Sequence, residues 1–449
     1  MANPSVIRVK FVAENGLADA GLTGLQSNWA KAQDFSGQRG RLLALPDADG
    51  SVGLWLFGVG GAEGRSPFLA GQAAAVLPEG TYTLEGEIGD PTLAAIGFRL
   101  GAYRFDRYRD ARPVPALILP EATDGAEVER QVEAATLARD LINTPANDLG
   151  PDALEQAAHD FARRNGMDVR VIAGDELLSA NFPMIHAVGR ASVQAPRLID
   201  LNWGDADHPK VTLVGKGVTF DTGGLDIKSA AGMLMMKKDM GGAANVLGLA
   251  HAIVSAELPV RLRVLLPVVE NAIAGASFRP GDVLRSRAGL TVEIGNTDAE
   301  GRLILADALA LADEEAPDLL IDMATLTGAA RVALGPDLPP VYSTDSDLAA
   351  KLAALGSAVE DPLWPMPLWA NYDSQLNSKI ADINNTGSGG YAGSVTAGLF
   401  LKRFVKKAKA WLHLDIFGWA PEARPGRPVG ATDQGIRALY MLIKDRYSA

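Results

Sequence analysis

Residues 296–302, Asn-Thr-Asp-Ala-Glu-Gly-Arg, place two carboxylates and a guanidinium at alternate positions. They follow residues 290–295, whose β-branched alternation indicates a strand, and they precede an apolar run typical of a helix. In an extended segment every second side chain shares one face, so we expect Asp298, Glu300 and Arg302 to point together from the end of a strand. Two adjacent anions repel unless a cation lies between them. The pattern therefore favours a divalent metal.

A second polar cluster, residues 215–228, follows an apolar strand and supplies Lys216, Asp221 and Lys228, while Asp239 comes later at the start of an apolar helix. Its glycine spacing fits neither the dinucleotide fingerprint nor the P-loop, which argues against nucleotide binding. The Asp and Glu residues of the two clusters supply enough negative charge for two divalent cations, and such hard oxygen ligands suit Mg, Mn or Zn. A lysine amine can join them only when it is deprotonated.

Each of these residues also has a structural explanation. Asp239 is placed to cap the helix that follows it, and Asp221 and Asp298 stand beside Thr and Gly, where Asp commonly closes turns. The combination favours chemistry, because both clusters lie in glycine-rich loops after apolar strands, and such loops meet at one edge of a sheet. His413 alternates with Asp415 on a predicted strand, which indicates a structural hydrogen-bonded pair there rather than a metal site.

Composition bounds the class of protein. The chain has 449 residues, of which 47% are hydrophobic and 21% charged, and this predicts a globular protein of two domains. The net charge of −12 argues against binding to nucleic acid or to an anionic membrane. The chain has no cysteine, which excludes disulfides and thiolate chemistry. It begins without the apolar core of a signal peptide and has no apolar run of the roughly 18 residues that span a bilayer, so we expect a cytoplasmic protein.

The order of predicted elements indicates an α/β fold. We expect a small N-terminal α/β domain over 1–124, a connecting helix and linker over 125–150, and a larger C-terminal α/β catalytic domain over 151–449, with a central mixed sheet flanked by helices. The predicted strands cover 6–12, 41–45, 52–58, 113–120, 169–173, 197–203, 210–216, 260–269, 290–295, 319–324 and 411–417. The predicted helices cover 66–77, 125–142, 152–164, 241–254, 394–407 and 432–445, with a further helix from Arg302.

Together these motifs resemble the leucyl aminopeptidase family of cytosolic di-metal aminopeptidases, and the tail resembles a bacterial branch of it. The segments that carry the resemblance are 214–224, 238–242, 296–303, 324–329 and 411–428, with Lys228. The similarity covers about residues 140–449, whereas the first 120 residues match only in position and α/β character. The fold and chemistry implied by this family are expectations for the structure.

The resemblance implies a metal-dependent aminopeptidase that removes the N-terminal residue from peptides with a free N-terminus. It implies two divalent metal ions per subunit, Zn or Mn. The ligands implied for these metals are Lys216, Asp221, Asp239, Asp298 and Glu300.

The resemblance also makes Lys228 and Arg302 the catalytic pair. Lys228 would polarise the scissile carbonyl, and Arg302 would hold a bicarbonate that acts as general base for a metal-bridging hydroxide. Arginine suits that role because its planar fork binds a planar oxyanion in two places.

Four residues align with the family's pocket for the first side chain of the substrate: Met236, Thr325, Gly328 and Phe417. Phe417 stands where many relatives have a small residue, so we expect a narrower pocket and assume no preference for leucine. The family further implies a homohexamer.

Two other functions start from the same residues. A di-metal phosphoesterase would share the carboxylates but would not need Lys228 as a carbonyl electrophile. A binding or regulatory protein would keep the fold without the catalysis, and some relatives bind DNA; the acidic composition and the absence of a basic stripe argue against this function here.

Overall fold

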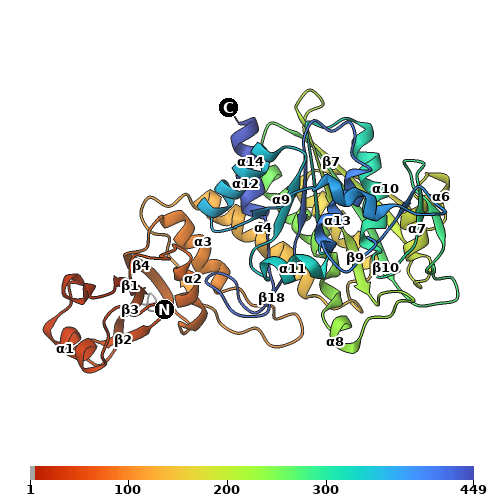
Figure 1. Cartoon of the computed structure of the whole chain (residues 1–449). Helices are drawn as coiled ribbons and strands as arrows, with labels where there is room; N and C mark the ends of the chain where they lie inside the picture. Colours follow the sequence, from red (N-terminus) through yellow and green to blue (C-terminus); the bar gives the residue numbers. More distant parts are fainter. Residues whose placement is uncertain (1–5, 449) are drawn as a thin grey trace. The chain divides into compact units, whose positions relative to one another are not determined.

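The computed structural model describes residues 6–448, which form two compact units (Figure 1). Unit 1 extends to Thr136 and includes Ala420–Gly430, whereas unit 2 contains Leu137–Trp419 and the chain from Ala431 onward. The expected architecture of a smaller N-terminal and a larger C-terminal α/β part is confirmed. The domain limits of 1–124, 125–150 and 151–449 stay a prediction, and they did not anticipate that Ala420–Gly430 packs with unit 1.

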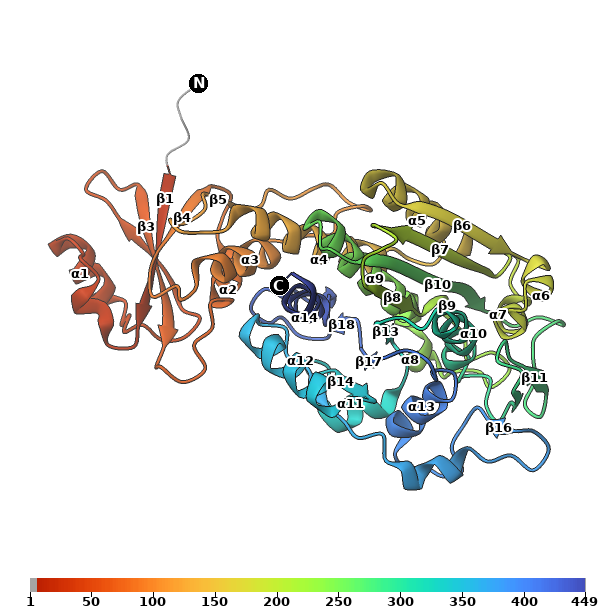
Figure 2. The same ribbon diagram turned by 90° about the horizontal axis from the view of Figure 1, so that it is seen from above.

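Unit 1 is a mixed sheet with helices on both faces (Figure 2). Side chains alternate along its strands, so Phe11 packs toward α2 and α3 on one face while Val12 packs toward α1 on the other. The sheet order is β2-β3-β1-β4-β5, with β1 Val6–Ala13, β2 Leu42–Pro46, β3 Val52–Gly60, β4 Thr81–Gly86 and β5 Ala116–Leu117. The helices are η1 Gly16–Asp19, α1 Gly24–Ala32, α2 Leu69–Val76 and α3 Pro91–Gly101.

The predicted strand over 113–120 shrinks to the two residues of β5. Prolines at 113, 115 and 120 lack the N–H that a ladder needs, which limits the pairing. The helix α4, Gly125–Asn143, agrees with the predicted connecting helix.

Unit 2 contains a central mixed sheet, for which nine strands are found among residues 6–448. At its centre, Val211 of β8 pairs with Leu262 of β10 and Leu319 of β13 in parallel register. Residues of β8 and β13 are buried on both faces, as the continuous apolar runs predict. The sheet order is β15-β14-β17-β13-β8-β10-β7-β6, with β9 also on β10; the strands are β6 Asp168–Ala173, β7 Arg197–Trp203, β8 Lys210–Gly215, β9 Gly217–Asp221, β10 Arg261–Asn271, β13 Leu319–Ala324, β14 Pro340–Ser343, β15 Trp364–Pro365 and β17 Trp411–Asp415.

Helices cover both faces of this sheet, with α9 and α14 on one side and α10 and α13 on the other (Figure 2). The predicted helix over 394–407 ends at Lys402. The bounds are α5 Pro151–Asn165, α6 Glu176–Ser179, α7 Pro183–Gly189, α8 Ala230–Met233, η2 Met236–Met240, α9 Gly241–Ser255, α10 Gly301–Glu314, α11 Gly328–Leu334, α12 Ser346–Ala358, η3 Ala370–Leu376, α13 Gly393–Lys402 and α14 Ile436–Tyr447. Among the described residues, no helix has both the length and the apolar character to cross a bilayer.

The strand predicted over 290–295 does not belong to the central sheet. It is reduced to β12, Thr291–Glu293, which pairs with β11, Val283–Arg285, and β16, Ile383–Asn384, in a separate small sheet. The residues after β12 form a turn, and Glu300 already stands at the N-cap of α10. The expectation of an extended segment carrying Asp298, Glu300 and Arg302 on one face is therefore wrong. The short strands β18, Trp419–Ala420, and β19, Gly430–Ala431, lie where the chain passes between the units.

Candidate metal centre

Lys216 occupies the single position between β8 and β9. Its backbone N–H donates to Met323 O at 3.0 Å, and its own carbonyl accepts from Ala243 N at 2.9 Å, so the strand β13 and the helix α9 fix its place. Gly301 makes room for the side chain, because a Cβ there would lie 2.5 Å from Lys216 Cε. The buried lysine is thus directed toward the start of α10.

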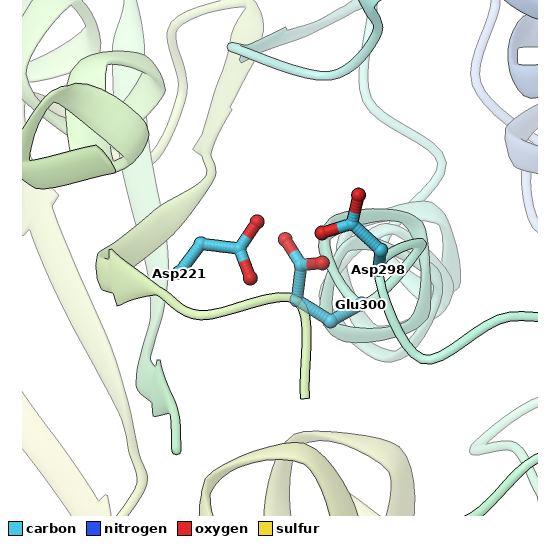
Figure 3. Close-up of side chains that lie close together, drawn as sticks. All are labelled: Asp221, Asp298 and Glu300. Atoms are coloured by element: carbon cyan, nitrogen blue, oxygen red, sulfur yellow. The ribbon is translucent and has the colours of Figure 1, made fainter. Parts of the chain in front are cut away.

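Three carboxylates converge beside this lysine. Asp221 ends β9, whereas Asp298 and Glu300 come from the turn that leads into α10. Oxygen atoms from all three lie within 4.8 Å of one another, and their carboxylates face each other (Figure 3). The turn brings Asp298 and Glu300 together, although the strand that was expected to do so is absent.

Asp239 lies in η2, and its side chain does not cap α9. Its carboxylate instead accepts from Thr325 Oγ1 at 2.8 Å and lies 2.8 Å from Lys216 Nζ. Lys216 Nζ also lies 2.9 Å from Glu300 Oε1, so the lysine joins Asp239 to the other carboxylates. The alternative in which Asp239 is only a helix cap is wrong.

Lys228 reaches the same cluster from the loop between β9 and α8. Its Nζ lies 2.9 Å from Asp221 Oδ2 and also forms an ion pair with Asp298 Oδ1. The structure therefore brings together six of the seven residues expected to bind metal or act in catalysis: Lys216, Asp221, Lys228, Asp239, Asp298 and Glu300.

The electrostatics of the cluster are those of a concentrated anionic site. Burial, followed by the charge of Asp221, raises the pKa of Glu300 and of Asp298 above their ordinary values. Burial opposes a charged Lys216, but Asp239, Glu300 and Asp221 outweigh it and raise the lysine pKa. The carboxylates thus repel one another, and two lysines compensate that repulsion only in part.

The donor set fits divalent cations. Its oxygen ligands are those that Mn, Mg and Zn accept, and the four carboxylates match the charge of two dications. Glu300 Oε2 is buried and has no hydrogen-bond partner among residues 6–448, although an unsatisfied buried oxygen is costly. A cation would satisfy that oxygen and remove the repulsion.

Arg302 forms no ion pair with these carboxylates among residues 6–448. Its Nη1 donates to Asn385 O at 2.6 Å, and its buried Nε lacks a hydrogen-bond partner within the described part of the chain. Arg302 lines a cavity of about 730 Å³ together with Asn296, Ala329 and Tyr391. A buried guanidinium with an unused donor beside a cavity is suited to hold an anion.

Two asparagines hold the site together, and the motifs did not reveal either. Asn271 Nδ2 donates to Asp221 Oδ1 at 2.8 Å; its place at the end of β10 was a usable signal, because polar residues at strand ends often serve sites. The buried Asn385 binds the backbone of the turn at Gly295 and Asn296. No local signal distinguishes Asn385 within its Asn- and Gly-rich loop.

The expected hydrogen bond between His413 and Asp415 is wrong, because His413 has another partner. His413 Nδ1 lies 2.6 Å from Asp322 Oδ1 on the neighbouring strand β13. Asp415 instead accepts from the backbone N–H groups of Leu326 and Thr327. His413 remains a structural residue, because these contacts join β17 to β13 and to the loop that follows β13.

Two of the residues aligned with the first-side-chain pocket, Thr325 and Met236, lie beside Asp239. Thr325 hydrogen-bonds Asp239, and a Cβ at Gly328 would lie 3.6 Å from Arg331 Nη2. Phe417 is 8% exposed, and Met236 is equally buried. Sequence reasoning missed Arg331, which stacks on the Phe417 ring.

Known proteins resemble the chain over its whole length. Residues 136–440 match the family model "Cytosol aminopeptidase family, catalytic domain", and residues 14–120 match "M17 aminopeptidase, N-terminal domain". A "Probable cytosol aminopeptidase" from Geobacter sp. is 39% identical, over 99% of this chain and 97% of the relative.

Solved structures of related proteins have the same fold as this chain. The crystal structure of the cytosol aminopeptidase from Coxiella burnetii superposes with a TM-score of 0.94 at 44% identity, covering 100% of this chain and 98% of the other. The bottromycin maturation enzyme BotP in complex with Mn gives a TM-score of 0.90 at 33% identity, covering 99% of this chain and all of BotP. These similarities extend over both units of the fold.

Proposed function

This chain belongs to the cytosol aminopeptidase family and is a metal-dependent aminopeptidase, and we propose how its residues carry out the reaction. Two divalent cations, Zn or Mn, bind Lys216, Asp221, Asp239, Asp298 and Glu300. The observation that carries this proposal is the cluster of facing carboxylates, in which Glu300 Oε2 is buried without a partner. The substrates are peptides with a free N-terminus.

When bound, the metal pair supplies a hydroxide nucleophile near neutral pH and binds the free α-amine of the substrate. The other steps fall to the chain. Lys228 is ion-paired to Asp221 and Asp298 in this structure, and cations held by those carboxylates would free its ammonium. Lys228 then donates to the scissile carbonyl and stabilises the oxyanion that forms there, a contribution of about 3–4 kcal/mol in other hydrolases.

Arg302 is the second member of the catalytic pair. Its unpartnered Nε and its position on the 730 Å³ cavity support a planar anion, bicarbonate, as its ligand. Arg302 would hold that anion where it could accept a proton from the nucleophile and return it to the leaving amine. Asn385 O holds the other side of the guanidinium and so fixes the direction in which Arg302 presents its free donors.

The test is hydrolysis of aminoacyl p-nitroanilides after dialysis against a chelator and readdition of Zn or Mn. Cleavage that returns with metal and requires a free α-amine supports the mechanism. An N-acetylated substrate is the matched control, because it differs only in the group that binds through its amine. Cleavage of the acetylated substrate, or activity that survives chelation, would refute the proposal. An aryl phosphate in the same assay tests the phosphoesterase alternative.

We also propose that the enzyme is a cytoplasmic homohexamer. The name cytosol aminopeptidase, which the relatives carry, supports the location. The resemblance to the leucyl aminopeptidase family supports the homohexamer. Light scattering after size exclusion measures the mass, and a monomer at micromolar concentration would contradict the hexamer.

A further inference from the structure

Two cations lie against the ring of Phe417. The guanidinium carbon of Arg331 is 4.4 Å from the ring centroid, and Lys238 Nζ is 5.3 Å from it. Phe417 itself is anchored, because its backbone N–H donates to Gln434 Oε1 at 2.9 Å. The ring is therefore a fixed surface that holds two positive charges near each other.

Neither charge has a carboxylate of its own. Lys238 is 2% exposed, and its nearest carboxylate oxygen is Asp239 Oδ1 at 3.8 Å, which is too long for a hydrogen bond. Asp239 already serves Lys216 and Thr325. Arg331 forms no ion pair or hydrogen bond through its side chain in the described part of the chain.

This arrangement is costly unless a further group joins it. A buried ammonium without a paired anion is strongly destabilising, and contact with an aromatic face offsets only part of that cost. A carboxylate bound beside Phe417 would pair with both cations.

Both cations border the residues proposed to receive the first side chain of the substrate. Lys238 lies in η2 with Met236, next to the proposed ligand Asp239. Arg331 Nη2 lies 3.6 Å from the place where a Cβ of Gly328 would stand, so the absent side chain of that glycine exposes the guanidinium. A substrate side chain that reaches Phe417 meets these charges.

We propose that the enzyme selects peptides whose N-terminal residue is acidic, with the aspartyl or glutamyl carboxylate bound by Arg331 and Lys238 beside Phe417. This inference rests on the proposed function. A carboxylate accepts charge-assisted hydrogen bonds from both cations. A neutral amide of the same shape leaves the cations unpaired, and sites with unpaired polar groups discriminate strongly against such analogues.

The experiment compares isosteric substrates on the Mn-loaded enzyme. We measure kcat/KM for glutamyl and glutaminyl p-nitroanilide, and for the aspartyl and asparaginyl pair, with leucyl p-nitroanilide as the apolar reference. These substrates lack a C-terminal carboxylate, so a charge effect reports the side chain alone. We expect at least a tenfold preference for the acid in one of the two pairs.

Variants then assign the preference to its residues. Arg331→Gln should lower the acid-to-amide ratio of kcat/KM at least tenfold, and Arg331→Lys should keep part of it. Arg163→Gln is the matched control, because Arg163 is exposed on α5 and pairs only with Asp160 in the described residues; it should keep the ratio of the wild type. If Arg331→Gln lowers the melting temperature so far that the protein cannot be assayed, the acid-to-amide ratio is measured in Arg331→Lys and Lys238→Met instead.

The outcomes separate the inference from the proposed function. Efficient cleavage of leucyl and glutaminyl substrates, with no preference for the acids, overturns acidic selection and leaves the aminopeptidase mechanism intact. An acidic preference that survives Arg331→Gln overturns the assignment to Arg331. No cleavage of any aminoacyl substrate with either metal overturns the proposed function and the inference together.

Discussion

Asn385→Ala should loosen the turn that carries two proposed metal ligands. The Asn385 side chain accepts from Gly295 N at 2.8 Å and Asn296 N at 3.3 Å, and donates to Asn296 O at 2.8 Å and Ala299 O at 3.4 Å. With about 1 kcal/mol for each of the two short bonds and about half of that for each long one, the free energy of unfolding should fall by about 3 kcal/mol. The same bonds hold Asp298 and Glu300 in register with Asp221.

The effect on activity should exceed the effect on stability. A displacement of about 1 Å in catalytic geometry costs on the order of 100-fold in rate, so kcat/KM should fall by about that factor, with weaker metal binding. Urea unfolding of the chelator-treated protein measures the free energy of unfolding. Titration with Mn measures the metal affinity, and a leucyl or glutamyl p-nitroanilide assay of the Mn-loaded protein measures kcat/KM.

The control is Asn245→Ala, which removes another fully buried asparagine. Asn245 donates to Gly241 O at 2.8 Å and accepts from Gln434 N at 2.9 Å, with no bond to the turn. It should cost about 2 kcal/mol of stability with a much smaller loss of metal affinity. If Asn385→Ala lost stability while its metal affinity and kcat/KM stayed within about twofold of Asn245→Ala, the anchoring argument would be refuted.

Three further predictions concern Lys228, the binding of metal and the buried carboxyl of Asp307. Lys228→Ala should lower kcat by about 100- to 1000-fold with unchanged metal content by elemental analysis; loss of metal with the activity would contradict its role toward the carbonyl. Metal at 100 times its dissociation constant should raise the free energy of unfolding by about 2.7 kcal/mol, and a melting temperature indifferent to chelator would contradict a site built in the folded state. Burial raises the pKa of Asp307 to about 7, so the folded chain keeps a proton that the unfolded chain releases near the ordinary value of 3.8. The contribution of Asp307 to stability is thus full below about pH 4 and is lost as the pH rises toward 7; Asp307→Asn should flatten this part of the unfolding profile, and an unchanged slope would exclude the residue as its source.

The residues of the candidate site could be predicted from the sequence because most of them lie in two short segments. The residue types of 215–228 and 296–302 determine which ligands exist, and their spacing made two clusters evident. Long apolar elements were equally predictable: α9 appears within a residue of its expected bounds, and α10 begins one residue before its expected start, because burial of a whole helix leaves a continuous apolar run. The absence of cysteine and the net charge likewise follow from composition alone.

The arrangement of these segments was decided by tertiary structure. The residues before Asp298 have the pattern of a strand of the central sheet. Only Thr291–Glu293 form a strand, in a small separate sheet, and the chain then turns. The β-propensity of so short a segment does not determine which sheet it joins, because packing decides that. Asp239 forms an ion pair with Lys216 instead of capping a helix, and His413 forms a hydrogen bond with Asp322 on the adjacent strand. Arg302 meets Asn385 across 83 residues of sequence. No local pattern encodes contacts of that separation, since they arise only when a sheet and its helices close around a common core.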